Sequence, residues 1–263
     1  MSRSVFFAIP AAILTLGLTL AQTGSAPKLT AETVKDLPVR NILSTFSSGR
    51  IADVAVDPRN RSVWYVATAS GGLWKTTNRG LSFSPIFDEG GSYSLGCVTL
   101  DPKNPDIVWL GSGENQAQRA IGYGDGVYKS TDAGKTWKSV GLTQSEHIGK
   151  IWVDPRNSSV VWVAAQGPLF SPGGERGLYK TTDGGQTWKP SLTISENTGV
   201  TDFDFDPRNP DIMYAAAYQR RRHTSIVVAG GPESAIYKTT DAGAHWTKLT
   251  DGIPTVDKGR IAL

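Results

Sequence analysis

One eight-residue motif occurs four times in this chain, and its regular recurrence is the feature that most limits how the chain can fold. The copies span residues 76–83, 130–137, 181–188 and 239–246. Each has a hydroxyl residue, Asp or Asn two places later, Gly two places after that, and an aromatic residue three places beyond the Gly. The side-chain oxygens can accept backbone N–H groups, and Gly tolerates a positive φ. The motif is therefore typical of a tight turn between two strands.

We expect the conserved spacing of this motif to serve structure and not ligand binding. The aromatic residue would close the base of the hairpin, and the Asp or Asn would hold the turn. The residues predicted to act structurally in this way are Asn78, Gly80, Asp132, Gly134, Trp137, Asp183, Gly185, Trp188, Asp241, Gly243 and Trp246.

The sequence between the motifs has the pattern of short strands. Each repeat begins with an alternating apolar segment that ends at Asp-Pro, as in 51–57, and continues after a turn with an almost continuous apolar run, as in 160–164. A short segment ending in an aromatic residue and Lys then precedes the motif, as in 126–129. Four strands in units of 51 to 58 residues predict an all-β fold: a β-propeller of four-stranded antiparallel blades.

The repeats also predict the domain organisation. Residues 46–250 would form four blades, and residues 251–263 would start a fifth blade, because Gly259 to Leu263 resembles a first strand. A propeller ring has to close, so four blades and part of a strand suggest a fragment of a larger ring. Residues 22–45 lack a clear period and are expected to be a lead-in segment.

Residues 1–21 have the pattern of a signal peptide. Arg3 gives a basic start, 5–20 are apolar apart from two Thr, and small residues follow from Ala21. The alternative is a membrane anchor, but this run is shorter than the roughly 20 residues that span a bilayer, and it contains Pro10. We predict cleavage after Ala21, a secreted or periplasmic protein, and no stable membrane insertion afterwards.

The composition argues against several classes of partner and cofactor. The net charge is +3, and no basic tract is longer than 220–223, so we expect no nucleic acid partner. A single cysteine, Cys97, excludes an internal disulfide and a multi-Cys metal site. The three histidines are scattered along the chain, so we expect neither a metal nor another cofactor.

Extra residues are inserted between the second and third strands of three repeats. The surplus is 8 to 14 residues relative to the first repeat. In an up-and-down blade these inserts emerge on the face opposite the motif, and repeat proteins often bind ligands there. Carboxylates, amides, arginines and aromatic residues suit sugar or peptide recognition, although the same residues also suit solvated loops. The candidate binding residues are Glu114, Asn115, Gln116, Arg119, Tyr123, Asp125, Phe170, Glu175, Arg176, Gln219, Arg220, Arg221, Arg222 and His223.

The motif, in the form Ser/Thr-x-Asp-x-Gly-x-Thr-Trp, resembles the Asp-box or BNR repeat of sialidases, xyloglucan-degrading glucanases and the sortilin/Vps10 propeller. Residues 46–263 also resemble large secreted bacterial proteins of the sortilin-like repeat type, which are commonly labelled glycosyl hydrolases. Segments 71–77, 111–115 and 124–130 carry this likeness. The resemblance implies a propeller whose Asp-boxes lie away from its working face.

The catalytic residues of these families do not transfer to the sequence. The sialidase Arg-Ile-Pro element has only 38–40, Pro-Val-Arg, as its nearest match, and the xyloglucanase Thr-Asp-x-Gly-Gly element corresponds to 68–72 with Ala69 in place of Asp. We therefore expect an exported propeller that binds a polymeric ligand, either protein, peptide or glycan, on the insert-bearing face. The alternatives are a passive scaffold and a glycoside hydrolase, for which Glu114 and Asp125 are weak catalytic candidates.

Overall fold

The computed structural model describes residues 30, 32, 49–116 and 121–263. The chain divides into two units, 1–41 and 42–263, and every strand of the described residues belongs to the second. The predicted signal peptide, almost all of the lead-in segment and Arg119 lie outside the described residues. Within the described part of the chain, no helix is long and apolar enough to cross a membrane.

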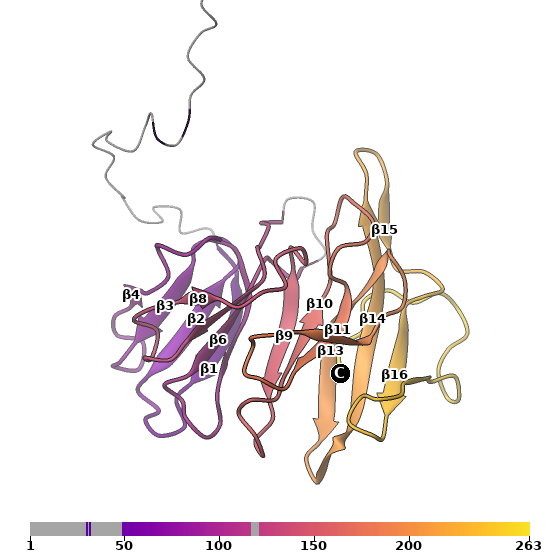
Figure 1. Cartoon of the computed structure of the whole chain (residues 1–263). Helices are drawn as coiled ribbons and strands as arrows, with labels where there is room; N and C mark the ends of the chain where they lie inside the picture. Colours follow the sequence, from indigo (N-terminus) through magenta and orange to yellow (C-terminus); the bar gives the residue numbers. More distant parts are fainter. Residues whose placement is uncertain (1–29, 31, 33–48, 117–120) are drawn as a thin grey trace, which may run out of the picture. The chain divides into compact units, whose positions relative to one another are not determined.

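Residues 49–263 form four antiparallel sheets that follow one another along the chain (Figure 1). In each sheet the strands are hydrogen-bonded in sequence order, so each sheet is one up-and-down blade. Blade 1 contains β1 (Ile51–Val56), β2 (Trp64–Thr68), β3 (Leu73–Thr76) and β4 (Ser84–Pro85). Blade 2 contains β5 (Leu95–Leu100), β6 (Val108–Ser112), β7 (Val127–Ser130) and β8 (Lys138–Ser139).

Blade 3 contains β9 (Ile148–Val153), β10 (Val161–Ala165), β11 (Gly177–Thr181) and β12 (Lys189–Leu192). Blade 4 contains β13 (Thr198–Asp206), β14 (Asn209–Arg222), β16 (Ala235–Thr239) and β17 (Thr247–Lys248), and β15 (Val227–Ala229) pairs with the end of β14. The predicted all-β propeller of four-stranded blades is confirmed. Residues 251–263 form only an isolated bridge, Gly231 to Lys258, so the fifth blade stays a prediction.

The first strand of every blade is irregular at the same place. The pairing of β1, β5, β9 and β13 with the second strand shifts by one residue near the start of each. Such a bulge increases the local twist of a strand. The shared register brings neighbouring first strands into polar contact: Asp53 Oδ2 accepts the Val98 N–H at 3.0 Å, and Lys150 Nζ donates to Asp202 Oδ1 at 2.9 Å.

The core lies between the blades. Every residue of β6 and β10 is buried, as predicted for strands covered on both faces. Trp109 and Trp162 are the largest fully buried side chains. The Trp152 and Phe205 rings stack across the boundary between blades 3 and 4, with 3.6 Å between their centroids. Apolar burial between sheets therefore provides most of the stability of this unit.

Each repeated motif forms a turn held by its hydroxyl and carboxylate. In the second copy, Ser130 Oγ accepts the Gly134 N–H at 2.8 Å, and Asp132 Oδ1 accepts the Thr136 N–H at 2.9 Å. Gly134 has φ of +86°, which suits glycine. In the fourth copy, His245 Nδ1 lies 2.7 Å from Asp241 Oδ2 and replaces the usual hydroxyl. These contacts are those of a hairpin turn, and the structural role of the motif residues stays a prediction.

The same turns also join neighbouring blades through lysines. In blades 1, 2 and 3 the lysine of the third strand donates to a backbone carbonyl of the next blade's Asp-box turn, and we call these contacts the interblade lysine bonds. In each case the ammonium group also lies 4.6 to 4.9 Å from an aromatic ring centroid of its own blade. The three bonds are Lys75 to Ala133 (2.8 Å), Lys129 to Gly184 (3.0 Å) and Lys180 to Ala242 (3.1 Å).

The motif tryptophans make the reverse contact. Trp137 Nε1 donates to the Ile86 carbonyl of blade 1 at 2.8 Å, and Trp188 Nε1 donates to the Val140 carbonyl of blade 2 at 2.7 Å. Each tryptophan thus satisfies its N–H while its ring packs against the preceding blade. The repeated motif therefore serves both the hairpin turn and the contact between blades.

Replacing Lys129 by Met should destabilise the protein. The change removes the charge-assisted bond to the Gly184 carbonyl and the cation–π contact with Trp109, and such a hydrogen bond contributes about 1.5–3 kcal/mol. Chemical denaturation would measure the loss. Lys138→Met is the matched control, since Lys138 is exposed and lies opposite Lys129 on the neighbouring strand β8. An equal loss of stability in both variants would contradict the role of Lys129.

The stability of the Asp-box turns should fall in acid. Hydrogen bonds from the Thr136 hydroxyl, the Thr136 N–H and the Ser130 hydroxyl hold the pKa of Asp132 well below its usual range. The pKa values of Asp183 and Asp241 are depressed in the same way. Their stabilisation is therefore fully present above the unfolded-state pKa of about 3.9 and is lost as the pH falls below it.

Melting temperatures measured between pH 6 and pH 2.5 would test this. Asp132→Asn should keep most of the stability at pH 6, because Asn78 fills the same place in the first turn and its Oδ1 accepts the Ser82 N–H at 3.0 Å. The variant should then lose less stability than the parent on acidification. An identical acid response would show that Asp132 is not one of the linked groups.

Candidate functional site

The two ends of the blades differ in which connections they carry. The Asp-box turns are bonded to the Asp-Pro turns at one end, as in the Ala133 N–H to Asp106 carbonyl bond of 2.8 Å. The inserts are bonded to the connections between blades at the other end, as in the Gly113 N–H to Ser94 carbonyl bond of 2.7 Å. The insert-bearing face therefore lies opposite the Asp-boxes, as the strand count predicted.

Three exposed aromatic side chains lie on the insert-bearing face, and we call them the aromatic track. Tyr93 is 67% exposed, Tyr123 is 52% exposed and Phe170 is 46% exposed. The Tyr123 and Phe170 rings come from the inserts of blades 2 and 3, and their centroids are 6.5 Å apart. Tyr93 comes from the connection between blades 1 and 2, where Ser92 Oγ donates to the Tyr123 carbonyl at 2.7 Å. The aromatic track thus crosses adjacent blades.

Beside the aromatic track lies a group of buried polar residues. We define the arginine cluster as Arg176, Arg220 and Arg221 with His147 and Gln166, all of them buried. Gln166 is central, because its Oε1 accepts Arg220 Nη1 at 3.1 Å and its carbonyl accepts Arg176 Nη1 at 2.7 Å. The His147 ring lies 6.0 Å from the Tyr123 ring, which places the cluster next to the track.

Arg176 organises the insert of blade 3. Its guanidinium donates to the carbonyls of Gly173, Gln166, Pro168 and Ser171. Burial, with repulsion from Arg221, lowers the pKa of Arg176 to about 10. All of these bonds go to its own insert and strand, so Arg176 fixes the loop that presents Phe170.

Glu114 is paired with Arg50. The Glu114 side chain is buried, and its Oε1 accepts both Nε and Nη2 of Arg50, with 2.8 Å to Nε. The Glu114 backbone N–H donates to Ser94 Oγ at 3.0 Å. Glu114, a candidate binding and catalytic residue from the sequence, therefore joins the insert of blade 2 to the start of β1.

Asp125 is bound by hydroxyl groups. Its Oδ2 accepts the Tyr128 hydroxyl at 2.5 Å, and its Oδ1 accepts Ser112 Oγ at 3.1 Å. Burial and this bond raise the pKa of Tyr128 to about 12. Glu114 and Asp125 thus have separate sets of partners, and no contact joins their carboxylates among the described hydrogen bonds and ion pairs.

Most of the remaining candidates contact residues far away in the sequence. Asn115 Nδ2 donates to the Gly149 carbonyl at 3.0 Å, and its Oδ1 accepts Arg260 Nη2 at 3.2 Å. The other contacts are Gln116 O with Arg220 Nη2 (2.6 Å), Glu175 Oε2 with Gln144 N (2.8 Å), Gln219 Oε1 with Glu233 N (3.3 Å), Arg221 Nη1 with Asn197 Oδ1 (2.7 Å), Arg222 N with Leu169 O (3.0 Å) and His223 N with Ile226 O (2.8 Å).

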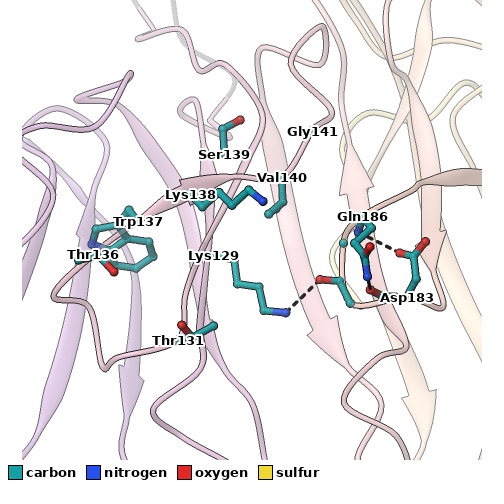
Figure 2. Close-up of a pocket in the computed structure, with 12 residues that line it drawn as sticks. Lys129, Thr131, Thr136, Trp137, Lys138, Ser139, Val140, Gly141, Asp183 and Gln186 are labelled. Atoms are coloured by element: carbon teal, nitrogen blue, oxygen red, sulfur yellow. Dashed lines mark hydrogen bonds between the residues drawn. The ribbon is translucent and has the colours of Figure 1, made fainter.

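A groove of about 700 Å³ lies between the outer strand of blade 2, β8, and the Asp-box turn of blade 3 (Figure 2). Figure 2 shows Lys129 reaching across it toward the turn that contains Asp183 and Gln186. The bond it makes, to the Gly184 carbonyl, is one of the interblade lysine bonds. Because polar groups of this groove are engaged in holding the blades together, we place the candidate site on the insert-bearing face.

Sequence reasoning missed three residues of this face. Tyr93 lies in a connection between blades, whereas the sequence predicted binding residues in the inserts alone. His147 and Gln166 lie next to the starts and ends of strands β9 and β10, so they occupy the same face. The sequence did indicate where these residues lie. All connections at the strand ends far from the Asp-Pro turns share one face, and the three residues are in or next to such connections.

Comparisons with known proteins agree with this architecture. A family model for Sortilin-Vps10, described as sortilin, neurotensin receptor 3, matches residues 125–258. The xyloglucanase Xgh74A of Acetivibrio thermocellus is 26% identical over 226 residues, which cover 74% of this chain and 25% of that protein. A xyloglucanase of Paenibacillus sp is 24% identical over 272 residues, covering 93% of this chain and 25% of that protein.

Solved structures show the same fold. An ancestral GH74 enzyme superimposes with a TM-score of 0.57 at 20% identity, covering 78% of this chain and 24% of that chain. The GH74 xyloglucanase from Xanthomonas campestris gives 0.54 at 20% identity, covering 75% and 29%. This chain spans about a quarter of the length of the curated relatives. Since the family model covers half of the sequence, including blades 3 and 4, the chain belongs to the Sortilin-Vps10 family of Asp-box propellers.

Proposed function

We propose that this propeller is exported and binds a polymeric glycan along the aromatic track of its insert-bearing face. The observation that carries this proposal is the exposure of Tyr93, Tyr123 and Phe170 on one face of consecutive blades. Aromatic faces pack against the C–H faces of sugar rings, and neighbouring polar groups can bond the hydroxyls. A row of such rings suits a chain of sugars better than a single small molecule.

The similarity to xyloglucanases supports a glycan over a peptide. Those relatives are named for activity on xyloglucan, a polymeric glycan, and their similarity covers most of this chain. The aromatic track would then contact several sugar units. Xyloglucan is therefore the first probe for this face.

The geometry supports binding over hydrolysis. Hydrolysis needs a carboxylic acid and a second carboxylate at the scissile bond, but Glu114 is ion-paired with Arg50 and Asp125 is bonded to Tyr128. Ala69, at the place of the xyloglucanase aspartate, is buried and its N–H donates to the Arg50 carbonyl at 2.8 Å. The alternative, a glycoside hydrolase, rests on the names of the relatives.

Replacing Tyr123 or Phe170 by Ala should weaken glycan binding about tenfold, as expected for loss of an aromatic contact and its buried area. Isothermal titration of the whole protein with xyloglucan oligosaccharides would measure this change. Both side chains are half exposed, so the variants should unfold at nearly the parent temperature.

Phe83→Ala is the matched control. Phe83 is also a partly exposed aromatic residue, at 42%, but it belongs to an Asp-box on the opposite face. Its removal should leave affinity unchanged. Equal losses at Phe83 and Tyr123, or binding of peptides with no binding of any glycan, would contradict the proposal.

The hydrolase alternative can be tested separately. Glu114→Gln and Asp125→Asn should leave any turnover of xyloglucan by the whole protein unchanged, because both carboxylates are committed to structural contacts. Reducing-sugar release would measure turnover, and thermal unfolding would detect structural loss. A large fall in turnover for either well-folded variant would establish the carboxylate as catalytic.

A further inference from the structure

The arginine cluster has positive charge without a matching ion pair. Arg176, Arg220 and Arg221 are all buried, and none of them lies within ion-pair distance of a carboxylate in the described part of the chain. Glu114, the acid that acts on Arg220 electrostatically, is already paired with Arg50. Buried charges without a counter-ion are costly, so the cluster is suited to receiving an anion.

The cluster also contains polar atoms without hydrogen-bond partners. Both ring nitrogens of His147, the Gln166 Nε2 group and the Arg221 Nε group are buried and unpartnered among the described residues. His147 is 1% exposed and Gln166 is 4% exposed. Buried polar groups in folded proteins nearly always have partners. These orphan groups therefore point to a bound molecule that supplies acceptors.

His147 and Gln166 lie on the Arg220 side of the cluster. The Gln166 N–H donates to the His147 carbonyl at 2.9 Å, and Gln166 Oε1 accepts Arg220 Nη1. Burial and the charge of Arg220 lower the pKa of His147 to about 3, so its ring is neutral and offers one N–H donor. A guanidinium, an amide N–H and an imidazole N–H thus belong to one connected group, of which His147 lies next to the Tyr123 ring.

We propose that Arg220, Gln166 and His147 bind the carboxylate of an acidic sugar, so that the glycan on the aromatic track contains uronic acid units. The inference rests on the proposed glycan-binding function and adds the charge of the ligand. A planar guanidinium matches a carboxylate in two-point hydrogen bonding. Tyr123, whose ring lies next to His147, would hold the sugar ring that bears this group.

Oligogalacturonate and its fully methyl-esterified form are the deciding probes, because they differ in charge and not in sugar backbone. With the whole protein, titration calorimetry should show the free acid binding at least tenfold more tightly than the ester. The preference should shrink as salt rises, since screening weakens charge pairing. Equal affinities for the two forms would overturn the inference.

Substitutions would show which residues cause the preference for the free acid over the ester. Arg220→Gln should reduce affinity for the free acid about tenfold or more and leave the ester unaffected, whereas Arg220→Lys should keep part of the acid preference. Arg208→Gln is the control for lost charge, because Arg208 is exposed in the Asp-Pro turn of blade 4 on the opposite face. Preference for the acid that survives in Arg220→Gln would place the anion elsewhere and overturn the assignment.

Arg220 is buried, so its replacement can reduce stability, and thermal unfolding of each variant must accompany the titrations. If Arg220→Gln does not fold, the acid and ester comparison on the parent protein decides the question alone. Tighter binding of a sulfated oligosaccharide, or of a peptide with a free carboxyl terminus, than of oligogalacturonate would refute the uronate assignment. Binding of xyloglucan with no preference for acid would leave the proposed function intact, and binding of no glycan would remove both.

Discussion

The interblade lysine bonds are the contacts on which the arrangement of this structure depends. The apolar core between the sheets provides most of the stability, and directional hydrogen bonds fix how one sheet is placed against the next. Lys75, Lys129 and Lys180 each cross that boundary to a backbone carbonyl of the neighbouring Asp-box turn. A carbonyl acceptor is present whatever side chain occupies its residue, so the contact tolerates sequence change in the turn, where Gly184 stands in the place of Ala133 and Ala242. The repeated turn thus sets the spacing of the blades.

This use of the Asp-box leaves the opposite face for recognition. The turn residues are occupied with hydrogen bonds inside the hairpin and to the preceding blade, and changing them would alter the blade contacts. The inserts have no such constraint, because they leave and re-enter the sheet at fixed strand ends. Arg176 shows how they are stabilised without a core: one guanidinium donates to four carbonyls of its loop and adjacent strand. A rigid loop then presents Phe170 to solvent.

Much of the fold could be predicted because it repeats. The spacing of Asp132, Gly134 and Trp137 predicted the turn, and the alternation of apolar residues before each Asp-Pro predicted the first strand. The interblade lysine bonds were not predicted, although a lysine recurs in every third strand. Its partner is a backbone carbonyl of the next repeat, and a carbonyl has no signature in the sequence.

The candidate site was predictable only as a face. The exposure of Tyr123 and Phe170 follows from their insert positions, but the burial of Arg220 does not, since arginines in loops are usually solvated. At the end of the long strand β14, Arg220 contacts Gln166 of blade 3 and Gln116 of blade 2. Its burial therefore depends on residues from three repeats. Sequence periodicity describes one repeat at a time and therefore cannot show it.

The balance of charge on the insert-bearing face follows from one pairing. Arg50 precedes the first strand of blade 1, and its bond to Glu114 neutralises the buried carboxylate closest in sequence to Gln116, which contacts Arg220. Because Arg50 occupies that carboxylate, Arg220 has no ion pair among the described residues, as the proposed anion site requires. The pairing that stabilises the joint between blades 1 and 2 thus also sets the electrostatic preference of the site between blades 2, 3 and 4.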